Sequence, residues 1–393
     1  MIEAISAHPL IAGKGMSVGG LQMSEVSLAE AAELQTPAYL FDPGVVVRRY
    51  QALRDALGTK LVVSFKANNL ADLIVRCGHC FVDGIELASI GELGVVTGRI
   101  AQRRFVNNPA MAPAFMRAAL ISGCDFIVDS VAQARALVAQ DAGNRTPRAL
   151  LRLNAAAIGD GGAEDHFGME VAQAAEAALI LTDSAIRVSG VHCFGGSNTF
   201  ARQGMSHAEN VRRALDRLQA STVQSFDEVN LGGGFAHDWE EVPARIDAYR
   251  RHVEDLFADA TVSHEAGRAI FGRAGAFLTR VVAVKTLAGR QVAICDGGMA
   301  QNFLLASTEG VLRRHSTPKL LSASQVESVD PVDVQYVGSS CNRQDVIGVA
   351  KAAETLPCVG DVCVFPDSGA YNSSYTVRDF LMLPAARNYL RAT

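Results

Sequence analysis

Short apolar runs separated by amphipathic stretches dominate the chain from about residue 37 to residue 285. Each run has the length and β-branched content of a buried strand, and several are followed by Ala-rich stretches with helical spacing. The expected strands are 38–41, 61–65, 84–87, 105–107, 126–128, 149–153, 188–193, 228–231 and 262–265, and the expected helices include 45–57, 132–140, 172–181 and 208–218. Such alternation predicts parallel strands joined by helices, and about eight units favour a β/α (TIM-like) barrel over an open sheet.

The pattern changes after residue 285. Short apolar runs continue at 291–295, 333–337 and 362–365 without regular helices between them. This pattern is typical of a mostly β domain. We therefore expect a barrel at 37–285 and a second, β domain formed by 1–36 and 286–393. The segment 13–24 receives no assignment.

Composition narrows the class of protein. The chain has 393 residues, of which 49% are hydrophobic and 20% charged, as expected of a globular protein with a large core. Its net charge of −5 disfavours nucleic acid as a partner. There is no apolar stretch of about 18 residues, so we expect no membrane span. The first residues lack the pattern of a signal peptide, and a cytoplasmic enzyme is the expectation.

The eight cysteines are scattered, unlike a disulfide framework. Cys77 and Cys80 have the spacing of a redox pair, but they follow a helical run instead of opening one, where the thiol pKa would be lowered. We expect them to be buried or incidental. No further ligands stand at a zinc-site spacing, so no metal site is expected.

Lys66 lies within the octet Val62–Asn69, directly after the expected strand 61–65. A lysine at the end of a barrel strand points into the usual catalytic mouth. Desolvation there lowers an amine pKa, and a neutral amine can form a Schiff base with an aldehyde. Taken alone, Lys66 is more typical of an ordinary lysine at a strand end, and it is the other motifs that reverse this preference.

Three further strand ends carry candidate chemistry. The turn Gly232–Gly234 would let backbone N–H groups approach a phosphate, or is simply a tight turn. Glu265 could hold a proton on a pyridinium nitrogen, or pair with Arg268. After the strand 188–193, Phe194 could pack on a cofactor ring and Ser197 could bind phosphate, although such an aromatic residue is more often core.

Two polar loops of the β domain add candidates. The loop 338–345 contains a thiol and a carboxylate, Cys341 and Asp345. Cys341 could donate a proton, although a lone cysteine is more often inert. A second turn, 367–371, carries the phenol of Tyr371.

These motifs, in this order, resemble those of the pyridoxal-phosphate-dependent amino-acid decarboxylases of fold type III, the group of diaminopimelate and ornithine decarboxylases. The resemblance runs from about residue 37 to the C-terminus. The matching segments are 65–68, 86–93, 231–235, 265–268, with Ala266 in place of a proline, 341–345 and 369–371. It implies pyridoxal 5'-phosphate as cofactor and a homodimer with shared active sites, in which the loop 341–345 reaches the partner's site.

The resemblance also implies roles for single residues. Lys66 would hold the cofactor, Glu265 would contact its pyridine nitrogen, and Cys341 of the neighbouring subunit would protonate the α-carbon. The residues implied in cofactor binding are Lys66, Phe194, Ser197, Gly233, Gly234, Glu265, Gly267, Arg268 and Tyr371. Those implied in substrate binding are Asn342, Arg343 and Asp345.

Three departures from the family pattern bear on the substrate. Phe194 replaces a histidine that stacks on the pyridine ring, and Asn342 replaces an acidic residue that faces a distal amine. Leu304 stands where diaminopimelate decarboxylases have a substrate-binding arginine. The chain is thus more similar to the biosynthetic branch, which acts in siderophore, antibiotic and exopolysaccharide pathways, in part on amino acids joined to citrate or to a carrier protein. Arg343 would suit an anionic or amide-linked distal end.

Alternatives stay open at this point. One is a diaminopimelate decarboxylase of lysine biosynthesis. Another is an amino-acid racemase on the same kind of barrel, which needs a second base opposite the lysine. A third is a non-enzymatic cofactor-binding protein, which the more than 100 residues beyond the barrel disfavour.

Overall fold

The structure is a computed structural model that describes residues 10–11, 20–140, 146–159, 165–184, 186–306, 315–324 and 326–392. It divides into two compact units, Arg49–Ile270 and, together, Met1–Arg48 with Phe271–Thr393. Of the unassigned segment 13–24, residues 13–19 lie outside the described ranges. No helix in the described ranges is long and apolar enough to cross a membrane.

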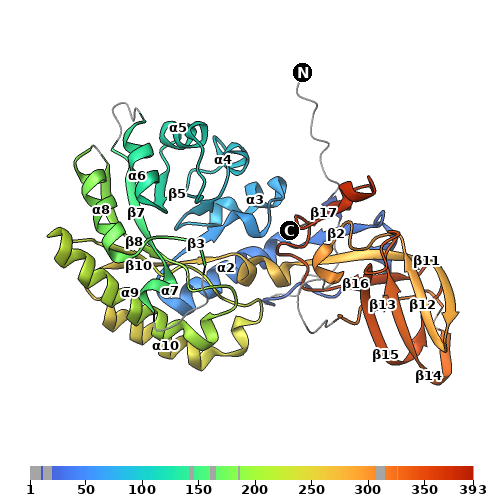
Figure 1. The fold of residues 1–393 in the computed structure, drawn as a ribbon. Coiled ribbons are helices and arrows are strands. Elements are labelled where there is room, and N and C mark those ends of the chain that lie inside the picture. Colours follow the sequence, from blue (N-terminus) through green and yellow to red (C-terminus); the bar gives the residue numbers. More distant parts are fainter. Residues whose placement is uncertain are drawn as a thin grey trace. The chain divides into compact units, whose positions relative to one another are not determined.

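The unit Arg49–Ile270 contains a closed barrel of eight parallel strands, which confirms the expected fold class (Figure 1). Going round the barrel, the strands are β3 (Lys60–Ser64), β4 (Ile85–Leu87), β5 (Arg104–Asn107), β6 (Asp125–Val128), β7 (Arg148–Leu153), β8 (Arg187–Cys193), β9 (Glu228–Asn230) and β10 (Thr261–Ala266). The ring closes where β10 pairs with β3, with Glu265 beside Val62. All carboxyl ends therefore lie at one mouth of the barrel.

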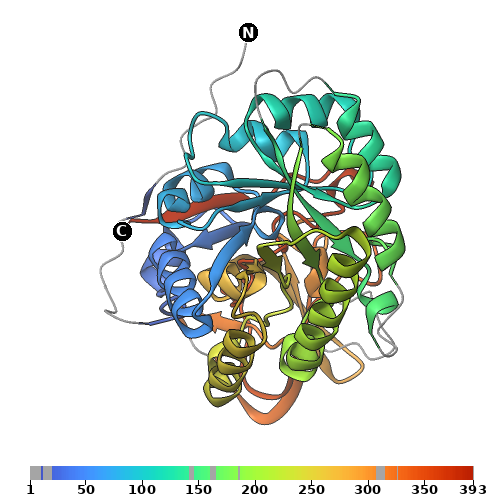
Figure 2. The ribbon, with the colours of Figure 1, turned by 90° about the vertical axis from the view of Figure 1, so that its left-hand side faces the viewer.

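Helices surround the strands, as Figure 2 shows. They are α2 (Pro43–Leu57), α3 (Ala71–Cys77), α4 (Ile90–Val96), α5 (Pro113–Ile121), α6 (Val131–Val138), α7 (Ala155–Ile158), α8 (Val171–Thr182), α9 (Phe200–Thr222), α10 (Pro243–Leu256) and α11 (Arg268–Phe271). Polar caps start several of them: Ser89, Ser130 and Asn154 each accept a backbone N–H of the first turn of α4, α6 and α7.

An apolar layer fills the barrel below the mouth. Val62, Phe105, Ile127 and Leu150, from four different strands, form one buried cluster, each at most 3% exposed. Such packing makes the barrel a solid core and leaves polar chemistry to the ends of the strands.

The other unit holds a nine-stranded sheet (Figure 1). Its strands are β1 (Leu10–Ile11), β2 (Ala38–Phe41), β11 (Gly275–Leu287), β12 (Arg290–Cys295), β13 (Lys319–Leu321), β14 (Val326–Val337), β15 (Val346–Leu356), β16 (Val362–Phe365) and β17 (Arg387–Arg391), with one short helix, α1 (Leu28–Ala32). A buried cluster that includes Leu40, Leu278 and Val364 packs against one part of this sheet.

Both expected domain boundaries differ from the observed ones. The segments 38–41 and 275–285, expected in the barrel domain, form β2 and most of β11, which pair with each other in the β unit. The barrel is complete without them, because its eight strands are supplied between Lys60 and Ala266.

Cys77 ends α3 and Cys80 ends the turn after it, as expected. Burial raises the pKa of Cys80, which is opposite to what a reactive thiolate requires.

Candidate active site

Every strand of the barrel carries a polar side chain at or next to its carboxyl end. We call this set the polar ring. In strand order it comprises Lys66, Glu86, Asn107, Asp129, Arg152, His192, Asn230 and Glu265. Seven of the eight residues are buried, from 0 to 7% exposed, and Lys66 is the exception. Buried polar groups persist only where they are paired or bind something, so the ring is a candidate site.

Lys66 lies in a short 3-10 turn, Phe65–Ala67, directly after β3. Its Nζ donates to Glu86 Oε1 at 3.1 Å, and Asn107 Nδ2 donates to the same oxygen at 3.1 Å. The side chain of Lys66 is 46% exposed, more than the burial expected from the sequence. The amine therefore lies within reach of a molecule that enters the mouth of the barrel.

Three buried atoms of the polar ring form no hydrogen bond within the described part of the chain: Glu86 Oε2 and both ring nitrogens of His192. Leaving such an atom unpaired costs free energy comparable to a lost hydrogen bond, or more for a charged group. His192 Nε2 lies within ion-pair distance of Glu265. Glu86 Oε2 and His192 Nδ1 are thus available to a bound molecule with polar groups of its own.

Arg152 balances the acidic members of the ring. Its Nη1 donates to Asp129 Oδ1 at 3.0 Å and to Asn107 Oδ1 at 3.3 Å. The ring of Phe167 lies 4.3 Å from the guanidinium carbon, a cation–π arrangement. Through Asn107, this pair is connected to Glu86 and Lys66.

Glu265 lies on β10, between β3 and β9 in the barrel. Its Oε1 lies 3.2 Å from His192 Nε2 and accepts a hydrogen bond from Asn230 Nδ2 at 3.1 Å. Burial would raise the pKa of Glu265, but the neighbouring His192, with Lys66 and Arg152, holds this pKa well below its usual range. The carboxylate is therefore ionised at neutral pH, as a partner for a protonated pyridine nitrogen must be.

The glycine turn after β9 packs directly on the turn after β8. A Cβ on Gly232 would lie 2.6 Å from the carbonyl oxygen of Cys193, and one on Gly234 would lie 2.8 Å from that of Gly196. Both glycines have positive φ, +67° and +105°. The N–H groups of Gly233 and Gly234 donate to no acceptor in the described chain. A cradle of free amides and no side chains fits a phosphate group.

Gly267 and Arg268 follow β10, on the same side of the barrel. A Cβ on Gly267 would lie 2.5 Å from that of Ala67, so the turn with Lys66 packs tightly against the end of β10. Ala266, in place of the family's proline, continues the pairing of β10 with Val63. Phe194 is half-buried, and Ser197 is exposed in the turn after β8.

The remaining predicted residues belong to the β unit. Cys341, Asn342, Arg343 and Asp345 lie in the loop between β14 and β15, where Cys341 is exposed and Asp345 is buried. Tyr371 has φ +68°, which is unusual for a residue with a side chain and is often found at functional sites. A contribution of these residues to the polar ring stays a prediction.

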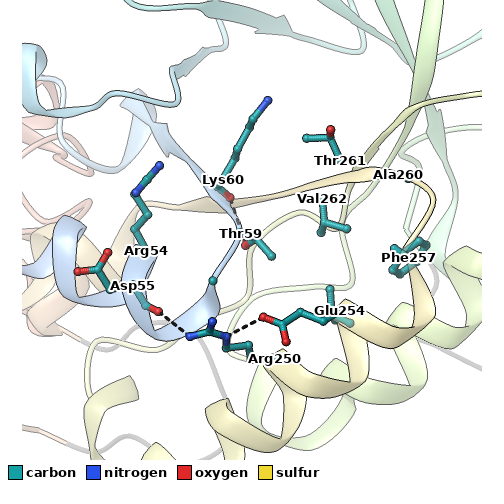
Figure 3. A pocket seen from close by; sticks show the side chains of 12 residues that line it. Arg54, Asp55, Thr59, Lys60, Arg250, Glu254, Phe257, Ala260, Thr261 and Val262 are labelled. Atoms are coloured by element: carbon teal, nitrogen blue, oxygen red, sulfur yellow. Dashed lines mark hydrogen bonds and ion pairs between the residues drawn. The ribbon is translucent and has the colours of Figure 1, made fainter.

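A pocket of about 570 Å³ lies elsewhere on the barrel (Figure 3). Lys60 and Thr261, the first residues of β3 and β10, line it. Lys66 and Glu265 belong to the opposite, carboxyl ends of those strands. Since catalysis in β/α barrels takes place at the carboxyl ends, this pocket is not the candidate active site.

Sequence reasoning found Lys66 and Glu265 but assigned no role to Asn107, Asp129, Arg152, His192 or Asn230. The sequence does mark these residues as candidates, because each is a polar residue at the end of an apolar run. It becomes informative only when the barrel brings these ends together.

A β/α barrel with a reachable lysine, an ionised buried carboxylate and a phosphate-sized glycine cradle defines the class of enzymes that use pyridoxal phosphate. The family described as "Pyridoxal-dependent decarboxylase, pyridoxal binding domain" matches residues 44–272. The chain belongs to this family of pyridoxal-phosphate-dependent decarboxylases.

Curated relatives cover several substrates. An L-glutamyl-[BtrI acyl-carrier protein] decarboxylase of Niallia circulans is 25% identical over 94% of this chain and 92% of the relative. A diaminopimelate decarboxylase of Actinosynnema pretiosum subsp. auranticum is 29% identical over 90% and 83%. A 2-[(L-alanin-3-ylcarbamoyl)methyl]-2-hydroxybutanedioate decarboxylase of Staphylococcus aureus is 26% identical over 88% and 92%. These names support decarboxylation and do not select one substrate.

The fold is also that of solved decarboxylases. The crystal structure of lysine decarboxylase from Selenomonas ruminantium matches with a TM-score of 0.77 and 20% identity over 94% of this chain and 97% of that one. The match includes both the barrel and the β unit.

Proposed function

We propose that this enzyme decarboxylates an amino acid whose distal end is joined to another group, citrate-like or carrier-borne, in a specialised biosynthetic pathway such as siderophore synthesis. The proposal rests on the charge that the loop 338–345 exposes. Arg343 is exposed, and no carboxylate pairs with it within the described chain. The one carboxylate of the loop, Asp345, is buried and 2% exposed. The loop therefore offers a cation and a thiol to its surroundings.

Asn342 supports the same substrate class. Its Oδ1 accepts the N–H of Gln344 at 2.9 Å, so the acceptor of the amide is used within the turn. An acidic residue at this place would bind a distal ammonium, as the family resemblance implies for free diamino acids. Without one, a distal ammonium would be desolvated and unpaired, whereas a carboxylate or amide would find Arg343.

The barrel supplies the groups that decarboxylation needs. Bound pyridoxal phosphate provides an electron sink for the electrons left behind by the departing α-carboxylate. Lys66 Nζ would hold this cofactor, and Glu265 would keep a proton on its pyridine nitrogen. The free N–H groups of Gly233 and Gly234 would bind its phosphate.

Further residues are proposed on the family pattern. Ser197, Gly267, Arg268 and Tyr371 would add phosphate contacts, and Phe194 would pack on the cofactor ring. Cys341 of the neighbouring subunit would give the proton to the α-carbon, which makes a homodimer part of the proposal.

The test is a panel of substrates assayed by mass spectrometry for loss of CO2. It contains free diaminopimelate, ornithine, lysine and arginine beside citrate-linked and carrier-linked amino acids, with Lys66→Ala as the inactive control. We expect turnover of a conjugate and a rise of about tenfold or more in its KM in Arg343→Gln, because a charge-assisted hydrogen bond is lost. Turnover of free diaminopimelate alone would contradict the proposal and favour the alternative that the Actinosynnema relative represents.

A further inference from the structure

The loop between β14 and β15 is folded around one buried carboxylate. Asp345 Oδ1 accepts the N–H of Met299 at 2.7 Å, and Oδ2 accepts the N–H of Ser340 at 3.1 Å. The backbone oxygen of Asp345 accepts the N–H of Gly338 at 2.9 Å. Asp345 therefore joins the loop that carries Cys341 to the segment 296–299, which follows β12.

Two glycines make room for this carboxylate. A Cβ on Gly298 or on Gly338 would overlap the oxygens of Asp345. Neither glycine has a positive φ, so backbone conformation does not explain them. Their lack of a side chain is instead explained by the close approach of two backbone segments to one carboxylate.

The rest of the loop depends on this anchor. The N–H of Asp345 donates to the carbonyl oxygen of Asn342 at 3.0 Å, which closes a turn that contains Arg343 and directly follows Cys341. Those two side chains stay exposed, whereas both oxygens of Asp345 are already in use. From this position Asp345 can hold the thiol of Cys341 and the guanidinium of Arg343 in place without contacting a substrate itself.

We propose that Asp345 is a positioning residue that holds Cys341 and Arg343 in place, and not a substrate contact. This role rests on the proposed function of those two residues. A carboxylate suits the task because it is acceptor-only and faces two N–H donors. Asparagine would keep one acceptor and turn an N–H donor toward another donor, and alanine would lose both bonds.

Hydrogen exchange, followed by mass spectrometry on the cofactor-loaded enzyme, tests the anchor directly. In Asp345→Ala we expect the amides of Met299 and Ser340 to exchange about tenfold faster or more, because each loses a charge-assisted bond. Gly338→Ala should do the same from the other side of the contact. The matched control is Asp361→Ala, since Asp361 is also buried in the same unit and accepts the N–H of Cys358 at 2.7 Å.

Product analysis tests the positioning role. The ratio of amine product to misprotonated side product should shift in Asp345→Ala as it does in Cys341→Ala, with Asp345→Asn between Asp345→Ala and the wild type. Asp361→Ala should keep the wild-type ratio even where it lowers stability, which separates positioning from a general structural effect.

Two results would overturn the proposal. Unchanged exchange at both amides in Asp345→Ala would remove the anchor, whatever the substrate. Faster exchange with a wild-type product ratio would show that the loop does not depend on Asp345 for its chemistry. Failure of the proposed function is distinguishable, because it appears as a wild-type enzyme without turnover of any conjugate, while the exchange experiment still decides whether the anchor exists.

Discussion

His264 gives the barrel a testable dependence on pH. It lies on β10, 1% exposed, one residue before Glu265. Its Nδ1 lies 2.8 Å from Thr59 Oγ1, and its Nε2 lies 2.8 Å from the hydroxyl of Tyr249. Burial, with a smaller effect of His207, lowers the pKa of His264 to about 3. The ring is therefore neutral in the folded protein.

The sign of the effect follows from the lowered pKa. The unfolded chain binds a proton at His264 below about pH 6.5, whereas the folded chain does not until about pH 3. The stabilisation is thus fully present above pH 6.5 and is lost as the pH falls. Between pH 8 and pH 5.5 this one group should cost about 1.4 kcal/mol of unfolding free energy, a value that depends only on the folded pKa being well below 5.5.

Urea unfolding at fixed protein concentration measures this difference. Trp239, the single tryptophan, is buried in the barrel unit and reports on it by fluorescence. His264→Gln retains one donor and one acceptor and removes the titration, so its loss between pH 8 and pH 5.5 should be smaller than that of the wild type by about 1.4 kcal/mol. His79→Gln, at an exposed histidine, is the matched control. Equal losses in the wild type and His264→Gln would refute the reasoning.

Two further predictions concern residues near the carboxyl end of β10. Glu265→Gln keeps an acceptor for Asn230 but loses the charge. We expect the variant to retain the cofactor, as seen in its visible absorbance, and to turn over substrate more slowly, by roughly 10²-fold or more. Unchanged turnover would contradict the role of the carboxylate. Gly267→Ala places a Cβ 2.5 Å from that of Ala67, so it should destabilise the barrel by roughly 1–3 kcal/mol and weaken cofactor affinity beside Lys66. Gly94→Ala, where no atom lies within 4 Å of the new Cβ, is its control, and equal urea midpoints in the two variants would argue against the tight contact.

The strands of the barrel could be predicted from the sequence because each is an apolar run with a clear end. Which sheet a run joins could not. The segment 38–41 looks like the first barrel strand, yet β2 pairs with β11 and with β17, whose residues lie more than 200 positions later in the chain. A run of four apolar residues is compatible with either sheet, and only its distant partners decide.

The residues of the candidate site likewise include some that the sequence could predict and some that it could not. Lys66 and Glu265 were found because each stands in a motif of several residues. Asn107 and Arg152 are single polar residues at strand ends, and only closure of the barrel brings Arg152 Nη1 to 3.3 Å from Asn107 Oδ1. For Gly233 and Gly234 the sequence allows both a phosphate-binding turn and a simple tight turn, and the free amides become visible only in the structure.

We expect the choice of substrate to depend on fewer residues than the decarboxylation reaction does. Relatives that act on a carrier-linked glutamyl group and on diaminopimelate are 25% and 29% identical to this chain, so overall similarity does not discriminate between them. The polar ring lies within the barrel unit and supplies chemistry that any substrate of the family needs. Under the proposed function, the loop 338–345 recognises the distal end of the substrate, since it exposes Arg343 while it buries its only carboxylate. The charge of one residue can decide between a distal ammonium and a distal carboxylate, because a mispaired charge costs more free energy than most neutral contacts contribute.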